Sequence, residues 1–262
     1  MIFELIVGQL LIILIIQLEE GLDLRTSTIM PRDTDYLLIG SGKLAKHLSA
    51  YFDFLQVPYK RWSRSEGKPL RIPENSKLKI LIAINDDAIV EFIERNFSGK
   101  KNNFTLIHFS GVLSIDEAES VHPLATFGNK TYSLDFYKSI PLITEEGKKP
   151  LKDIFAEFPN PNFTIRSNDK SLYHAWCAIG GNFISLIWKV FADRMAEFNI
   201  PKNALRPYLS KTLENFMLGN NHLTGPFIRK DMNTIKKHRE ALINDEFKTI
   251  YDDFLKLFFG FE

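Results

Sequence analysis

Hydrophobic positions between residues 36 and 166 form short apolar runs separated by stretches with helical spacing. Strands are predicted over residues 36–39, 57–62, 79–84, 104–109, 139–144 and 163–166, and helices over 43–54, 88–96 and 148–158. A continuous apolar run such as 79–84 is typical of a strand buried on both faces of a parallel sheet. The alternation predicts a Rossmann-like α/β fold with a doubly wound parallel sheet.

The pattern changes near residue 168. Residues 169–198 lack proline and carry apolar residues at helical spacing, with Gly180 and Gly181 in the middle and Pro201 just beyond the end. Further helical patterns cover 203–218, 231–244 and 245–259. We therefore expect a sheet domain over 31–168, followed by an all-α C-terminal domain over 169–262.

Residues 1–30 form a separate apolar extension. Residues 2–16 would make a helix of about 22 Å, which is shorter than the roughly 30 Å hydrocarbon core of a membrane. The first basic residue, Arg25, follows the apolar run, whereas a signal peptide has its basic residues before it. Three interpretations remain: a short membrane anchor through residues 1–18, a helix that packs on the body, or a start codon assigned upstream of Met30.

The charge and the cysteine content of the chain argue against several classes of function. A net charge of +1 without a basic stripe argues against a nucleic-acid partner, and cysteine–histidine spacing of the metal-binding kind is absent. The lone Cys177 excludes an internal disulfide and fits a reducing, cytoplasmic compartment.

The first predicted strand runs into Gly40-x-Gly42-x-x-Ala45 at the start of a helix. This is the context of a dinucleotide-binding turn, where a tight turn and a close backbone approach place a pyrophosphate at the helix N-terminus. The predicted cofactor contacts here are Gly40, Ser41, Gly42, Lys43 and Leu44. The alternative is a tight turn that binds nothing.

The end of the second strand bears on the choice of cofactor. An acid that would bind the ribose diol of NAD is missing until Glu66, and Ser63, Arg64 and Ser65 stand in its place. These residues suit a 2′-phosphate, so we expect NADPH to bind roughly ten- to a hundredfold more tightly than NADH. A solvated basic loop is the alternative.

Polar residues also follow the next two strands. Asn85, Asp86 and Ser110 are predicted to border the cofactor, although capping of the next helix is the preferred role for Asp86 and Asp87. His108 and His122 come near adjacent strand ends, and His122 is a candidate for substrate binding.

Together these motifs carry a family resemblance. The order G-x-G-x-x-A, S-R-S, N-D-D-A-I, H-F-S-G, V-H-P-L-A-T-F, K-S-L-Y-H-A and L-T-G-P-F-I-R-K-D spans residues 35 to about 245. It is similar to a bacterial family that pairs a Rossmann-like NADP-binding domain with a helical domain of unknown function 2520. More distantly, it resembles pyrroline-carboxylate reductases and 6-phosphogluconate-dehydrogenase-like proteins. The resemblance implies a dimeric, cytoplasmic, NADP-dependent oxidoreductase. Lys230 replaces a glycine of the family pattern, which puts the shape of that loop in doubt.

The resemblance also suggests roles on the long helix, where related reductases use a lysine or histidine as proton donor and an asparagine to hold the substrate. Lys170 could donate a proton, His174 could donate or orient, and Asn182 could bind substrate. The alternative is that Tyr173 and His174 only pack and Lys170 is solvated. Thr224 and Arg229 are further substrate candidates, while Asp231 is expected to cap a helix.

These observations predict an NADPH-dependent oxidoreductase that acts on a small, anionic carbonyl or imine metabolite in the cleft between the domains. The helical domain is expected to form a homodimer, because it carries more apolar surface than the sheet domain covers. A catalytically silent NADP-binding sensor or scaffold is the alternative, since a fold does not guarantee turnover.

Overall fold

The computed structural model describes residues 36–67, 69–70, 72, 77–99, 104–219 and 224–260. The chain forms two compact units, one ending at Asn182 and the other beginning at Phe183. The first unit therefore includes Lys170 and His174. The apolar extension over 1–30 lies outside the described residues.

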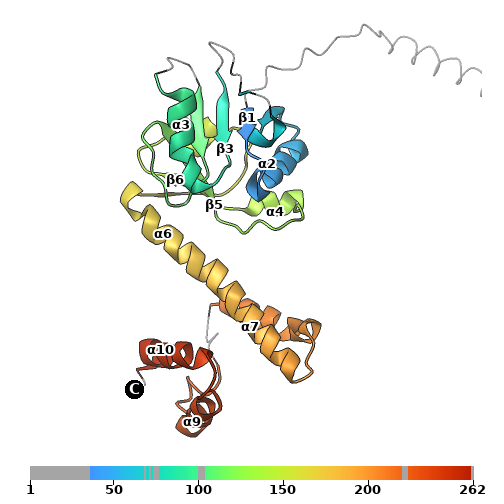
Figure 1. Cartoon of the computed structure of the whole chain (residues 1–262), viewed down its shortest axis with the longest axis vertical. Coiled ribbons are helices and arrows are strands. Elements are labelled where there is room, and N and C mark those ends of the chain that lie inside the picture. Colours follow the sequence, from blue (N-terminus) through green and yellow to red (C-terminus); the bar gives the residue numbers. More distant parts are fainter. Residues whose placement is uncertain are drawn as a thin grey trace, which may run out of the picture. The chain divides into compact units, whose positions relative to one another are not determined.

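A seven-stranded sheet forms the centre of the first unit (Figure 1). Its strands are β1 (Tyr36–Ile39), β2 (Tyr59–Trp62), β3 (Lys79–Ile82), β4 (Thr105–His108), β5 (Ala118–Pro123), β6 (Leu142–Glu145) and β7 (Asn162–Ile165). Their order is β2-β1-β3-β4-β5-β6-β7, and every pair is parallel except β5 with β6. The chain thus has the mostly parallel, Rossmann-like sheet that the alternating pattern predicts.

Alternate residues of the central strands pack into two separate hydrophobic cores, one on each face of the sheet. Leu38, Leu81 and Ile107 pack with α2 (Lys43–Phe54), α4 (Leu134–Ser139) and α5 (Leu151–Ile154). Leu37, Ile39, Ile80, Ile82 and Leu106 pack with α3 (Ile89–Phe97). Because both faces of the sheet are covered, its central strands have no polar face, which explains their continuous apolar runs.

The sequence pattern missed β5 and α4. Strand β5 reads Ala-Glu-Ser-Val-His-Pro, so small and polar side chains hide the apolar signal that marked the other strands. His122 lies near the end of this strand, next to a strand end as the sequence analysis expected. The helix predicted over 148–158 forms only over Leu151–Ile154, because Phe155 leaves the helical conformation and packs into the core.

The predicted long helix is present but changes its geometry midway. After the short η3 turn (Ser167–Asp169) it comprises α6 (Lys170–Cys177), a π-helical segment (Ala178–Phe183) and α7 (Ile184–Glu197). Of the described residues, Ser167–Glu197 alone is long and apolar enough to cross a membrane. One such helix is weak evidence, since core helices of soluble proteins pass the same test.

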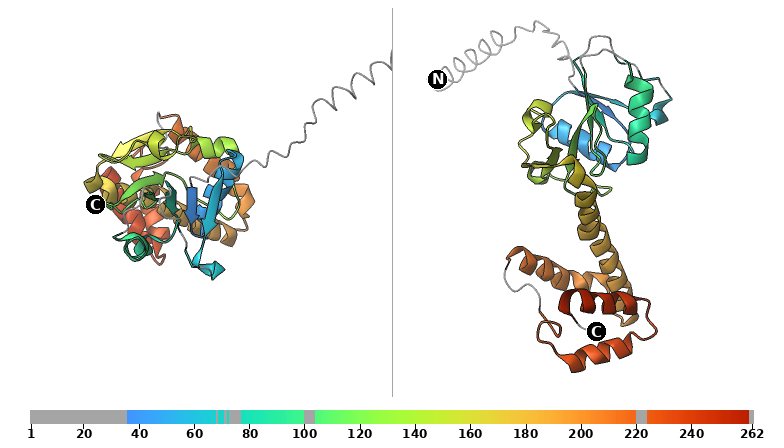
Figure 2. Two further views of the ribbon diagram at one scale, coloured as in Figure 1. Left: turned by 90° about the horizontal axis from the view of Figure 1, so that it is seen from above. Right: turned by 90° about the vertical axis from the view of Figure 1, so that its left-hand side faces the viewer.

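The second unit is all-helical, as the sequence predicts. It contains α7, η5 (Lys202–Leu205), α8 (Arg206–Met217), α9 (Met232–Ala241) and α10 (Phe247–Phe259), which Figure 2 shows from two further directions. Four buried apolar side chains, one each from α7, η5, α9 and α10, lie inside it: Ala192, Leu205, Ile235 and Leu255.

Candidate functional site

The turn between β1 and α2 contains two glycines with different physical reasons to be there. Gly40 has φ +130°, and a Cβ at this position would lie 2.2 Å from the carbonyl oxygen of Ala83, so the fold itself requires glycine. Gly42 has φ −70°, and a Cβ there would have no heavy atom within 4 Å. The protein gives no internal reason for glycine at 42, which leaves its backbone open to approach from outside.

The N-terminus of α2 is suited to an anion. Gly42 is the N-cap, no side chain caps the helix, and its first turn carries no acidic residue. Ser41 and Lys43 are exposed beside it, while Leu44 is half-buried against the core. Uncapped backbone N–H groups and the helix dipole favour negative charge at this end, so the turn fits a pyrophosphate.

Ser63, Arg64 and Ser65 lie where β2 gives way to the short η1 turn (Arg64–Glu66). The Ser63 hydroxyl is buried; it lies 2.8 Å from the Ser65 hydroxyl and donates to the Glu66 carboxylate at 3.1 Å. Arg64 is exposed and forms no ion pair with another described residue. The loop thus presents the Arg64 cation next to two hydroxyls, of which Ser63 already donates to Glu66.

The ends of β3 and β4 are linked by a short hydrogen bond. The Ser110 hydroxyl donates to the Asp86 carboxylate at 2.6 Å and accepts from the backbone N–H groups of Val112 and Leu113. The expectation that Asp86 or Asp87 caps the following helix is wrong, because the N-cap of α3 is Ala88 and no side chain bonds there. The intervening η2 turn (Asp86–Ala88) moves both acids too far upstream. Asn85 is exposed at the same edge.

β5 and α6 bring two histidines together. The Nδ1 atom of His122 lies 2.7 Å from the Tyr173 hydroxyl, and the rings of His122 and His174 are 5.6 Å apart at 89°. Gly111 makes room for them, because a Cβ there would lie 2.5 Å from His174 Cδ2 and 3.1 Å from His122 Nε2. Burial lowers the pKa of His122 to about 4, helped by His174 and Lys170. His122 is therefore neutral at neutral pH.

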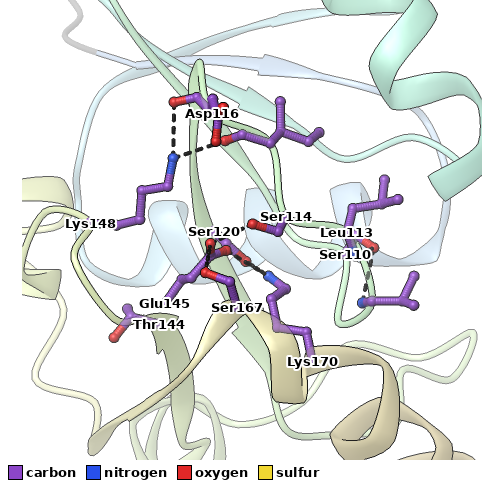
Figure 3. Close-up of polar contacts among 12 residues, drawn as sticks. Ser110, Leu113, Ser114, Asp116, Ser120, Thr144, Glu145, Lys148, Ser167 and Lys170 are labelled. Carbon is purple, nitrogen blue, oxygen red and sulfur yellow. Dashed lines mark hydrogen bonds and ion pairs between the residues drawn. The ribbon is translucent and has the colours of Figure 1, made fainter.

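Lys170 lies in a buried polar network (Figure 3). Its ammonium donates to the Ser120 hydroxyl and to Glu145 Oε2, the latter at 3.2 Å. Glu145 Oε1 accepts from Ser114 at 2.5 Å and from Ser167 at 2.6 Å. Lys170 and Glu145 are each only 3% exposed, so the alternative that Lys170 is solvated is wrong.

Burial acts on both charges of this network. It lowers the pKa of Lys170, against the opposing attraction of Glu145. Burial alone would raise the pKa of Glu145, but hydrogen bonds from Ser114 and Ser167 and the Lys170 charge outweigh it, so this pKa is lowered. The pair is an ion pair at neutral pH, held entirely by protein groups.

His108 pairs in register with Ser120, which bonds to Lys170. It is fully buried, and neither ring nitrogen has a hydrogen-bond partner among the described residues. Burial lowers its pKa to about 4, with a further contribution from Lys170. His108 is thus a neutral, unsatisfied side chain next to the network.

Three further candidate residues have exposed side chains. Asn182 is exposed in the π-helical segment, while Thr224 and Arg229 are exposed in the second unit. Lys230 adopts φ +54°, the conformation that its replacement of glycine put in question. Asp231 is the N-cap of α9 and accepts from the Thr234 N–H at 3.2 Å, which confirms the predicted cap.

Sequence reasoning missed Glu145 and Tyr173, as well as the three serines that bond to Lys170 and Glu145. Glu145 lies one position beyond the end of its predicted strand, and Tyr173 was weighed only as a packing residue. Two features of the sequence could have indicated Glu145: it directly follows a buried strand, and Lys170 lies on an otherwise apolar helix. Because a buried charge needs a partner of opposite charge, the two residues could have been paired.

Comparison with solved structures identifies proteins of similar fold. A Bacteroides fragilis protein, provisionally described as an NADP oxidoreductase, has a TM-score of 0.67 at 20% identity, covering 84% of this chain and 95% of its own. An Aspergillus terreus reductive aminase, in complex with NADPH and ethyl-5-oxohexanoate, has a TM-score of 0.54 at 10% identity, with 87% and 95% covered. A 1-pyrroline-5-carboxylate reductase of Streptococcus pyogenes has a TM-score of 0.51 at 12% identity, with 83% and 93% covered.

Among curated proteins, none matches the sequence significantly. Residues 142–256 match the model of the family described as domain of unknown function DUF2520. The matched segment begins at β6 and includes Glu145, Lys170 and the Tyr173–His174 pair. The resemblance drawn from the motifs is confirmed: this chain has a Rossmann-like fold, and its residues 142–256 match the DUF2520 family model.

Proposed function

We propose that the protein is an NADP-dependent oxidoreductase that reduces a C=N or C=O bond of a small, anionic metabolite. The observation that carries the proposal is Gly42, a glycine that leads into an uncapped helix and has open space where a side chain would be. The bound NADPH in the similar reductive aminase, and the provisional description of the Bacteroides fragilis protein as an NADP oxidoreductase, support the same cofactor.

The cofactor would be held by groups along the carboxyl edge of the sheet. The backbone from Gly40 to Leu44 would bind the pyrophosphate, and Arg64 with Ser63 and Ser65 would bind a 2′-phosphate. Asn85, Asp86 and Ser110 would border the nicotinamide half. When bound, the reduced nicotinamide supplies a hydride to the electrophilic carbon.

His122 and His174 are the groups that would meet the substrate. The heteroatom of the reduced bond must gain a proton, and we assign this donation to His174, which is only half-buried. Lys170, which the sequence also suggested as proton donor, instead donates hydrogen bonds to Ser120 and Glu145. Its contribution would be to keep the β5–α6 junction in place. Asn182, Thr224 and Arg229 stay candidates for substrate contacts, Arg229 for a carboxylate.

The decisive experiment is a fluorescence titration of the full-length chain with NADPH and then NADH. We expect tight NADPH binding that weakens at least tenfold for NADH. In Arg64→Ala the NADPH dissociation constant should rise by about ten- to a hundredfold while NADH binding changes little, because only NADPH carries the 2′-phosphate.

Arg95→Ala is the matched control, since Arg95 is equally exposed but lies in the last turn of α3. If the native chain binds neither nucleotide, the proposal fails. If Arg64→Ala binds NADPH as well as the native chain does, the basic loop does not select the cofactor.

A second measurement separates an enzyme from a silent NADP-binding sensor or scaffold. Oxidation of NADPH would be followed with 1-pyrroline-5-carboxylate, and with a ketone plus an amine, as substrate probes. Turnover of either class supports the oxidoreductase. If the protein binds NADPH but turns over neither substrate class, the result favours the sensor.

A further inference from the structure

His122 has a single hydrogen-bond partner among the described residues, the Tyr173 hydroxyl at 2.7 Å from its Nδ1 atom. The two rings are 5.5 Å apart and nearly perpendicular, which directs the phenol oxygen at the edge of the imidazole. The opposite ring nitrogen, Nε2, packs against Gly111 beside the His174 ring and has no hydrogen-bond partner among the described residues. His122 therefore has one nitrogen held by a protein group and one whose hydrogen-bonding capacity is unused within the part of the chain that the structure describes.

The direction of this hydrogen bond decides which nitrogen carries the proton. A neutral imidazole has one N–H donor and one acceptor nitrogen. If Nδ1 carried the proton, the phenol oxygen would accept it, and the phenol hydrogen would need another acceptor. Among the described residues, the other contact of the Tyr173 hydroxyl is the thiol of Cys177. Because sulfur is a weak acceptor, the phenol instead donates to Nδ1.

Both partners keep the protonation state that this arrangement requires. Burial, with contributions from His174 and Lys170, lowers the pKa of His122 to about 4, so the ring is neutral near pH 7. Burial and the Cys177 contact raise the pKa of Tyr173 above its ordinary value of 10, so the phenol keeps its proton.

We infer that Tyr173 is a positioning residue that fixes His122 as the neutral tautomer with its proton on Nε2, so that His122 presents one hydrogen-bond donor to the substrate. A neutral donor binds a carbonyl oxygen, an imine nitrogen or a carboxylate without adding charge, and it discriminates against molecules that lack an acceptor at that point. The substrate part of this inference rests on the proposed function, whereas the tautomer is a property of the free protein.

The tautomer is measured by NMR on the full-length chain labelled with ¹⁵N-histidine. Two-bond proton–nitrogen correlations distinguish the protonated ring nitrogen from the bare one, and His122→Asn assigns the signals of His122. We expect a bare Nδ1 and a protonated Nε2 at pH 7. In Tyr173→Phe the ratio of the Nε2-protonated to the Nδ1-protonated tautomer of His122 should fall by up to about tenfold. This change corresponds to the loss of one ordinary hydrogen bond.

The chain provides a matched control in its second unit. There His238 Nδ1 lies 2.9 Å from the Tyr251 hydroxyl, so Tyr251→Phe removes the same kind of contact. It should leave the His122 signals unchanged. A protonated Nδ1 in the native protein would overturn the inference, as would a ratio that Tyr173→Phe does not alter. NADPH titration of the same samples tests the proposed function separately, because cofactor binding does not depend on this tautomer.

Discussion

Lys170 and Glu145 are almost fully buried, and their charges are compensated by each other and by three serine hydroxyls. Removing one partner of such a pair leaves an unpaired charge in the interior, whereas replacing both by apolar residues of similar size is often neutral or stabilising. We expect Glu145→Ala to lower the free energy of unfolding by about 3–5 kcal/mol. Glu145→Leu combined with Lys170→Met should recover most of this loss.

Urea denaturation of the single and double variants measures these differences. NADPH-dependent turnover of the double variant then tests Lys170, since a folded variant that keeps its turnover would exclude the lysine as proton donor. Equal destabilisation by the single and double changes would show that the pair does not act as a unit.

The buried His108 should make the folded protein less stable at acidic pH. Its pKa is about 4 in the folded protein against 6.5 ordinarily, so between these values the unfolded chain binds more protons than the folded one. Stability should therefore fall as the pH drops from about 6.5 to 4, by up to about 3 kcal/mol from this residue.

His108→Leu should remove that part of the pH dependence. It should also raise stability at pH 7, because it replaces two unsatisfied buried nitrogens with an apolar group. Urea denaturation at pH 7 and pH 5 provides the measurement. An undiminished pH dependence in His108→Leu would place its origin elsewhere.

At the scale of elements, the β1–α2 turn allows stability and cofactor binding to be separated. Gly40→Ala should cost at least about 2 kcal/mol of stability, because it combines a strained φ with a clash against Ala83. Gly42→Ala should change stability by no more than about 1 kcal/mol, since its Cβ meets open space. The same change should weaken NADPH binding at least tenfold, because the methyl group would occupy the proposed pyrophosphate position.

Thermal unfolding and nucleotide titration of the two variants test this contrast. If Gly42→Ala binds NADPH like the native chain, the pyrophosphate does not approach the backbone there, and the cofactor site would need to be sought elsewhere on the sheet edge.

The elements that could be predicted from the sequence are those with uniform burial. Strands β1, β3 and β4 are covered on both faces, so their continuous apolar runs mark them directly. Strand β5 and the buried lysine–glutamate pair could not be found this way, because partners far apart in sequence satisfy their polar groups. Glu145 lies 25 residues from Lys170 and Ser120 lies 50 residues from it, and neither spacing is a sequence motif.

At the scale of the whole molecule, the second unit carries many large hydrophobic side chains that are exposed. Large hydrophobic side chains on α7, α8 and α10 and at their ends are each more than half exposed: Leu186, Phe198, Phe216, Met217, Leu257 and Phe258. Apolar exposure of this extent typically marks an interface, and most interfaces between identical chains have twofold symmetry. We therefore propose a homodimer formed through the helical unit.

Light scattering coupled to size-exclusion chromatography should give twice the 30.3 kDa mass of the chain at micromolar concentration. Leu257→Glu with Phe258→Glu should shift the protein to the monomer, because each change would bury a charge in the interface. Lys236→Glu with Lys237→Glu is the matched control, since both lysines are exposed on the polar α9 helix. A native protein that elutes with the mass of one chain would rule out the dimer. A dimer that survives the α10 changes would place the interface on other helices of the unit.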